Sequence, residues 1–138
     1  MRIVVDTNVL VSGLLSPHGA PGRVVDGLIS EALQMLYDDR LLEEYREVLA
    51  RPKFGFVQRD VDDLMTQLAA AGEHIAASPL DLELPHADDL PFLEVASAGN
   101  AEALVTGNPR HFPARARRGV QLMSPAEFVK HWAEVGQP

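Results

Sequence analysis

The sequence has no cysteine, few aromatic residues and no long apolar run. Without cysteine among its 138 residues, the chain has no disulfide scaffold, no thiolate zinc site and no cysteine nucleophile. No apolar stretch approaches the roughly 18 residues that a membrane-spanning helix needs. Asp6 interrupts the apolar start Ile3-Val4-Val5, where a signal peptide would continue its apolar segment. We therefore expect a soluble, cytoplasmic protein without membrane association, and the length favours a single domain over residues 1–138.

Positive charge is scarce and unevenly placed. The chain has 12 Lys and Arg against 20 Asp and Glu, which gives a net charge of −8 at pH 7. Residues 1–102 hold 7 basic and 18 acidic side chains, whereas residues 103–138 hold 5 and 2. This balance argues against nucleic-acid binding by general electrostatics, but it allows phosphate binding through metal ions that carboxylates hold. The late basic cluster either guides a polyanion toward such ions or forms a solvated loop; it comprises Arg110, Arg115, Arg117 and Arg118.

Short apolar segments alternate with amphipathic ones, which predicts an α/β fold with a parallel sheet covered on both faces. We predict strands at 3–5, 35–37, 103–105 and 120–123. We predict five helices. The first opens at Pro21 and has an apolar stripe that reaches Leu36, and the second runs from Asp39 to Ala50. The third starts at an Asp60 N-cap, the fourth follows Asp88-Asp89, and the fifth starts at the capping box Ser124-Pro125-Ala126-Glu127. Residues 78–85 read as an exposed connection.

Polar residues collect where the predicted strands end. Asp6 follows the first strand, and Asn108 follows the strand at 103–105. Asp88 and Asp89 stand at a helix start, and Glu44 lies within a helix. Ligands of parallel sheets bind outside the carboxyl ends of the strands, so we expect Asp6, Asn108 and Asp89 to face one crevice. Carboxylates brought together without Lys or Arg need a counter-ion, and oxygen ligands suit Mg²⁺ or Mn²⁺ better than zinc.

Each of these residues also has a structural explanation. Asp88 is a good N-cap by itself. Glu44 belongs to a helix in which other acids alternate with arginines, a pattern typical of a solvated helix face. The combined pattern, and not any single carboxylate, favours a metal site.

Several stretches, in their order along the chain, resemble the PIN-domain family, and in particular its bacterial branch of toxins from toxin–antitoxin systems. The stretches are Val4-Val5-Asp6-Thr7-Asn8-Val9-Leu10, Leu41-Leu42-Glu43-Glu44-Tyr45-Arg46-Glu47-Val48-Leu49, Arg51-Pro52-Lys53-Phe54, Ala87-Asp88-Asp89-Leu90-Pro91-Phe92-Leu93, Leu104-Val105-Thr106-Gly107-Asn108 and Ser124-Pro125-Ala126-Glu127-Phe128. No single motif is specific, whereas the ordered set over nearly the whole chain is.

The resemblance implies a three-layer α/β/α sandwich with a central, mainly parallel sheet and a divalent-metal nuclease site. By position, Asp6, Glu44 and Asp89 match the family's first three acids, and Asp88 matches a common accessory acid. The fourth acid of the family is Asn108 here, which offers an oxygen without charge and so implies a weaker ligand.

Other positions fill out the implied site. His86 stands where this branch often has another Asp, which lowers the charge of the site further and, with Asn108, leaves open whether one or two metal ions bind. Asn8 and Thr106 are implied to orient ligands, and Arg110 is implied to contact the RNA backbone.

The function implied by the resemblance is a Mg²⁺- or Mn²⁺-dependent endoribonuclease that hydrolyses RNA with a metal-activated water and acts as a toxin held by an antitoxin protein. The apolar face of the helix that begins at Pro21 also predicts a homodimer, and the alternative is that both sides of this helix are buried within one sandwich. The alternative is a PIN-like binding module with a weakened nuclease site, which Asn108 favours. An aspartyl-phosphate phosphatase is disfavoured, because position 8 is Asn and the only late lysine, Lys130, lies in a helix.

Overall fold

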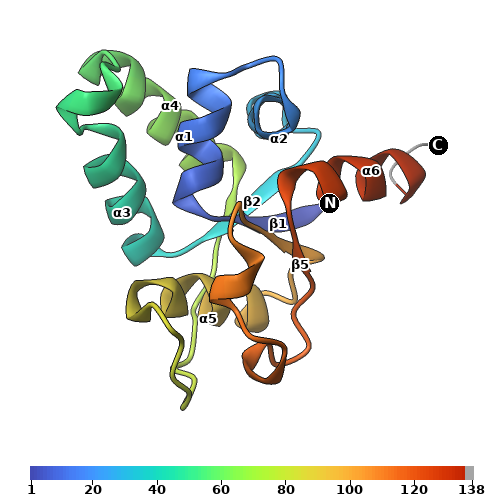
Figure 1. The fold of residues 1–138 in the computed structure, drawn as a ribbon. Coiled ribbons are helices and arrows are strands. Elements are labelled where there is room, and N and C mark those ends of the chain that lie inside the picture. Colours follow the sequence, from blue (N-terminus) through green and yellow to red (C-terminus); the bar gives the residue numbers. More distant parts are fainter. Residues whose placement is uncertain (136–138) are drawn as a thin grey trace.

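The strand that ends at Asp6 forms the centre of a five-stranded sheet. The computed structural model describes residues 1–135, and its strand order is β3-β2-β1-β4-β5 with every neighbouring pair parallel (Figure 1). The strands are β1 (Arg2–Val5), β2 (Gln34–Tyr37), β3 (Glu73–His74), β4 (Ala103–Val105) and β5 (Leu122–Met123). The predicted parallel sheet is confirmed.

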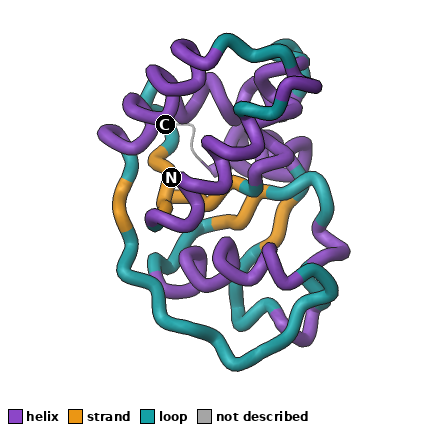
Figure 2. The backbone as a smooth tube through the Cα atoms, turned by 90° about the vertical axis from the view of Figure 1, so that its left-hand side faces the viewer, coloured by secondary structure: helices purple, strands orange, loops and turns teal. Residues whose placement is uncertain are grey.

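Helices cover both faces of this sheet. They are α1 (Thr7–Leu15), α2 (Ala20–Ile29), α3 (Asp39–Leu49), α4 (Gln58–Ala71), α5 (Leu90–Ala98) and α6 (Pro125–Val135). Figures 1 and 2 show α5 alone on one side of the sheet, where it packs against β1, β2 and β4. The other helices lie on the opposite side, with α4 against β2 and α6 against β4 and β5. The expected three-layer α/β/α sandwich is therefore confirmed.

The middle strands are buried on both faces, as their apolar sequences require. Ile3, Val4 and Val5 are fully buried, and Ile3 pairs with Met35 on one side and Ala103 on the other. This double burial leaves the ends of β1 and β4 as the places where polar side chains can reach solvent.

The sequence misses one helix and mispredicts two helix boundaries. Helix α1 was not predicted at all. The helix that opens near Pro21 ends at Ile29, because Leu36 belongs to strand β2 instead of the same apolar stripe. Helix α4 begins at Gln58 after Val57, so Asp60 lies in its first turn and is not the N-cap.

Several local predictions are confirmed. In the capping box, the Glu127 backbone N–H donates to the Ser124 hydroxyl over 3.1 Å, and the Glu127 carboxylate accepts from the Ser124 N–H over 2.9 Å. The predicted strands at 3–5, 35–37 and 103–105 match β1, β2 and β4, whereas the strand predicted at 120–123 is shorter, as β5. Within residues 1–135, no helix is long and apolar enough to cross a membrane.

Candidate functional site

The candidate site lies at the carboxyl ends of the neighbouring strands β1 and β4. The chain leaves β1 into α1 on one face of the sheet, and it reaches β4 from α5 on the other face (Figure 1). Such a reversal opens a crevice at the strand ends. The Asp6 backbone N–H donates to the Val105 carbonyl over 2.9 Å, which holds the two strand ends together.

Asp6 is buried directly after the end of β1. Its exposed fraction is 6%, and its Oδ2 accepts a hydrogen bond of 2.7 Å from the hydroxyl of the fully buried Thr106. Burial raises the pKa of the Asp6 carboxyl and the charge of Asp89 raises it further, while the bond from Thr106 opposes them. The Thr106 hydroxyl accepts in turn from the Asn108 N–H over 3.0 Å, so Asp6 belongs to a fixed polar chain.

Glu44 approaches the start of α1 from helix α3. The Thr7 hydroxyl donates a hydrogen bond to its Oε2. Burial raises the pKa of Glu44, the bond from Thr7 lowers it, and the charges of Asp6 and Asp88 raise it. The neighbouring Tyr45 fixes the position of this helix, because its buried hydroxyl donates to the Val5 carbonyl over 2.6 Å.

Asp89 enters from the opposite face, at the start of α5. Its side chain is 15% exposed, and within residues 1–135 its buried Oδ2 accepts no hydrogen bond. The Nδ1 atom of His111 lies 3.3 Å from this oxygen, without the alignment of a hydrogen bond. Burial raises the pKa of Asp89; the charges of His111 and His86 lower it, and that of Glu44 raises it.

His111 is a residue that the sequence did not single out. It ends the short 3₁₀ turn η3 (Pro109–His111) after β4, and its ring lies 4.1 Å, centroid to centroid, from the ring of His86. The sequence offers no signal for this pair, because the fold brings together the turn after β4 and the segment before α5.

Asp88 and the acids of helix α3, Glu44 included, line a pocket beside these residues. Arg40, Glu43, Glu44, Glu47 and Asp88 line a pocket of about 400 Å³, which we call the acidic pocket. Its single arginine is already neutralised: the Arg40 guanidinium lies 2.8 Å from Asp38 and 2.7 Å from Glu94. Asp88 is exposed and makes no side-chain cap to α5, so the structure does not assign it the N-cap role.

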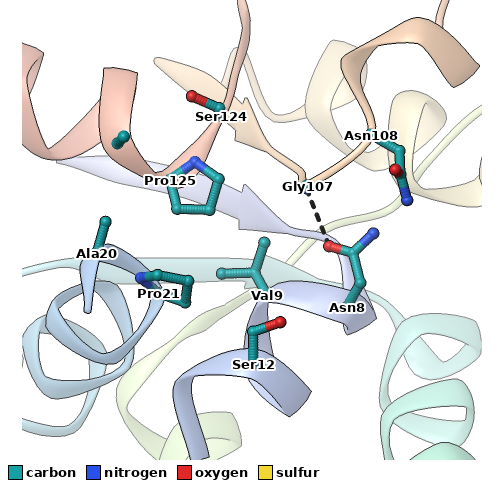
Figure 3. Close-up of a pocket in the computed structure, with 10 residues that line it drawn as sticks. Asn8, Val9, Ser12, Ala20, Pro21, Gly107, Asn108, Ser124 and Pro125 are labelled. Carbon is teal, nitrogen blue, oxygen red and sulfur yellow. Dashed lines mark hydrogen bonds between the residues drawn. The ribbon is translucent and has the colours of Figure 1, made fainter. Parts of the chain in front are cut away.

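Asn8, Asn108 and Arg110 lie to the side of the three acids. The Asn8 Oδ1 accepts from the Gly107 N–H over 3.0 Å (Figure 3). Asn8 and Asn108 line a pocket of about 470 Å³ between α1, α2 and the start of α6. Arg110 is exposed on η3, next to His111.

The three acids fit a hydrated divalent cation. Asp6 and Glu44 have raised pKa values partly through acidic neighbours, and Asp89 keeps a buried oxygen without a hydrogen-bond donor. Among residues 1–135, no three carboxylate or imidazole groups stand close enough to hold one ion directly. A divalent cation held here would therefore have to keep several water ligands, as Mg²⁺ usually does in proteins.

Comparisons with known proteins agree with this architecture. The family model for the PIN domain matches residues 2–110. An uncharacterized protein of Methanocaldococcus jannaschii is 32% identical over 53 residues, which are 38% of this chain and 34% of that protein. The match thus spans about a third of the length of this curated relative.

A solved structure shares the fold. It is the crystal structure of VapBC2 from Rickettsia felis bound to a DNA fragment from their promoter. The TM-score is 0.58 at 17% sequence identity, and the alignment covers 90% of this chain and 98% of the chain it matches.

Proposed function

The chain belongs to the PIN-domain family, and from this premise we propose that it is a divalent-metal-dependent endoribonuclease and the toxin of a toxin–antitoxin system. The observation that carries the proposal is the buried Oδ2 of Asp89, which lacks a hydrogen-bond donor and interacts electrostatically with Glu44 and Asp6. His111 and His86 offset part of the charge of Asp89, whereas Asp6 and Glu44 have no such basic neighbour among the influences on their pKa values, and like charges that raise one another's pKa weaken the fold.

In this proposal, Asp6, Glu44 and Asp89 hold the cation, and Mg²⁺ and Mn²⁺ are the ions that suit their oxygen atoms. The chemistry that a bound cation would supply is activation of water for attack on a phosphodiester and compensation of charge on the phosphoryl oxygens. Thr106 and Thr7 orient the carboxylates of Asp6 and Glu44 through their hydroxyl donors.

The neighbouring residues have smaller proposed roles. Asn108 adds a weaker oxygen ligand, and Asp88 is an accessory acid at the rim of the acidic pocket. Asn8 steadies the loop after β4 by accepting from Gly107. Arg110, exposed beside the site, contacts the RNA backbone.

The proposed partners are an RNA substrate and a cognate antitoxin. The name of the Rickettsia felis neighbour, VapBC2, supports the antitoxin as a proposal for this chain. A homodimer stays a prediction with less support, because the helix on which it depended ends at Ile29 and its residues Val24, Val25 and Leu28 are buried within one chain. A single domain over residues 1–138 and a cytoplasmic location are likewise proposals.

A second candidate is a PIN-like binding module with a weakened nuclease site. The uncharged Asn108 at the fourth position favours it. The retained acids Asp6, Glu44 and Asp89 oppose it, because a decayed site has no reason to keep carboxylates that raise one another's pKa.

The experiment is RNA cleavage by the purified protein with Mn²⁺, beside an Asp6→Asn variant. We expect the wild type to cut mixed RNA into fragments with 5′-phosphate ends and the variant to be inactive, because Asn keeps the shape of Asp6 without its charge. Cleavage that persists undiminished in the variant contradicts the nuclease site, and an inactive wild type that still binds RNA favours the binding module.

A further inference from the structure

The pocket of about 470 Å³ beside the acids is built unlike the acidic pocket. It lies between Asn8 and Asn108 on one side and Pro21 and Pro125 on the other, with Ser12 and Ser124 at its walls (Figure 3). Every residue that lines it is uncharged, in a chain with 20 acidic side chains. We call it the neutral pocket.

The neutral pocket adjoins the proposed cleavage site through two short links. Asn8 follows Asp6 by two residues at the start of α1. Gly107 follows Thr106, whose hydroxyl is bonded to Asp6, and the Gly107 N–H is bonded to Asn8. Whatever occupies the neutral pocket therefore lies against the residues that flank Asp6 and Thr106.

Hydrogen bonds hold some polar side chains of the neutral pocket in place and leave other donors and acceptors of the pocket available to a ligand. The Asn8 Oδ1 is engaged by Gly107, which leaves the Asn8 amide NH₂ to donate. The Ser124 oxygen accepts from the Glu127 N–H, so its hydroxyl hydrogen is also left to donate. Within residues 1–135, no hydrogen bond involves the side chain of Asn108, and Figure 3 shows it pointing toward Asn8.

The apolar part of the lining comes from ring and branched side chains. The rings of Pro21 and Pro125 and the branched side chain of Val9 form its rigid apolar surface. A mixed lining of this kind, with no charge and a few fixed donors and acceptors, matches an uncharged planar heterocycle better than a phosphate, a peptide carboxylate or a metal ion.

We infer that the neutral pocket binds a nucleobase of the RNA, next to the phosphodiester that the acids would cut. This inference rests on the proposed function and extends it to how the substrate is selected. Protein pockets that read single bases combine apolar surfaces on the base faces with hydrogen bonds to the base edge, and an asparagine amide offers a donor and an acceptor side by side. The base that is held then fixes which phosphodiester reaches the acids.

The test uses nuclear magnetic resonance of the ¹⁵N-labelled full chain without metal. The probes are the four ribonucleosides, free ribose and inorganic phosphate. We expect at least one nucleoside to shift the Gly107 amide and the Asn8 and Asn108 side-chain amides, with an affinity about tenfold or more above that of ribose. Equal binding of ribose, binding of phosphate alone at these residues, or no shift with any nucleoside overturns the inference.

Two variants connect the shifts to the neutral pocket. Ser12→Trp places a large ring at its wall, and Ser16→Trp places the same ring just beyond the end of α1, outside the pocket. We expect Ser12→Trp to abolish nucleoside binding and Ser16→Trp to retain it. If both variants bind as the wild type does, the nucleoside sits elsewhere and the inference fails.

Cleavage assays separate this inference from the proposed function. RNA cleavage with Mn²⁺ but no nucleoside binding overturns the base pocket and leaves the nuclease proposal standing. Nucleoside binding without any RNA cleavage leaves the base pocket standing and overturns the nuclease proposal. If both hold, Ser12→Trp should broaden or move the cleavage positions on a defined RNA, whereas Ser16→Trp should not.

Discussion

The hydroxyl of Thr106 donates a hydrogen bond of 2.7 Å to Oδ2 of Asp6, and thereby joins residues 100 positions apart in the sequence. Each residue directly follows a central strand, β4 for Thr106 and β1 for Asp6. The bond opposes the rise in the Asp6 pKa that burial causes. Thr106 therefore keeps Asp6 easier to ionise, which a metal ligand requires.

Replacing Thr106 with valine removes the hydroxyl and keeps the shape. We expect Thr106→Val to destabilise the fold at neutral pH by about 1–3 kcal/mol, because the bond is made to a charged acceptor. The pKa of Asp6 should rise further, so that Mn²⁺ binding needs a higher pH. Chemical denaturation measures the first effect and Mn²⁺ titrations at several pH values measure the second. Thr106→Ser, which keeps a donor, should stay closer to the wild type in both.

Asp6, Glu44 and Asp89 should make the metal-free chain less stable as the pH rises from acidic to neutral, whereas the lowered pKa of the exposed Glu127 acts in the opposite direction. Asp6, Glu44 and Asp89 all have raised pKa values in the folded state. Between the ordinary carboxyl pKa of about 4 and those raised values, the folded chain binds more protons than the unfolded chain. The stabilisation from these protons is complete below the ordinary carboxyl pKa and is lost as the pH rises through the raised pKa values of the folded state. Thermal unfolding in EDTA between pH 4 and pH 8 measures it.

Asp6→Asn is the matched variant for this pH dependence. Because Asp6→Asn removes one of the titrating groups, stability should decline less steeply with pH than in the wild type. The melting temperature near pH 8 should be higher than that of the wild type by a few degrees. A variant that declines as steeply as the wild type shows that Asp6 is not a source of the pH dependence.

Much of the fold could be predicted because its signals are local. Ile3-Val4-Val5 has the length and branching of a buried strand, and the Ser124–Glu127 box opens α6 as expected. Helix α1 carried no signal, because Val9, Leu10 and Val11 are all buried and no polar face alternates with them. Leu33 and Leu36 continue the helical spacing of α2, but both lie beyond its end. Leu33 is buried in the link to β2 and Leu36 in β2 itself, because tertiary packing and not the local pattern decides where the helix ends.

The candidate site was less predictable than the fold. Asp6, Glu44 and Asp89 influence one another's pKa values, and Asp6 directly follows a central strand while Asp89 starts a helix, but their joint role as ligands stays a prediction. The contact of His111 with Asp89 arises where the turn after β4 meets the segment before α5, which no local pattern encodes. The sequence also could not show that Asp88 points to a solvent-exposed rim.

Restoring charge at Asn108 tests whether this position faces the cation. We expect Asn108→Asp to bind Mn²⁺ more tightly, because a carboxylate replaces an uncharged amide. The rise in melting temperature on adding Mn²⁺ should therefore be larger than in the wild type. An equal or smaller rise means that Asn108 takes no part in holding the ion.

His111 should influence Asp89 directly. Its charge lowers the pKa of Asp89 across a separation of 3.3 Å. In His111→Ala the pKa of Asp89 should therefore rise, which the carboxyl ¹³C shift reports in a metal-free pH titration. His131→Ala, a change in α6 that borders a different pocket, should leave the midpoint unchanged. An Asp89 midpoint that stays in place or falls in His111→Ala contradicts the assigned contact.

The central claim is that Asp6, Glu44 and Asp89 together bind a hydrated divalent cation, and calorimetric titration with Mn²⁺ tests it most directly. The wild type should bind Mn²⁺, and Asp6→Asn, Glu44→Gln and Asp89→Asn should each weaken binding by about tenfold or more, since even supporting residues of metal sites contribute that much. Glu47→Gln, on the same helix as Glu44 with a side chain 66% exposed, should bind as the wild type does. A wild type that binds no Mn²⁺, or a loss in Glu47→Gln as large as in Glu44→Gln, contradicts the account.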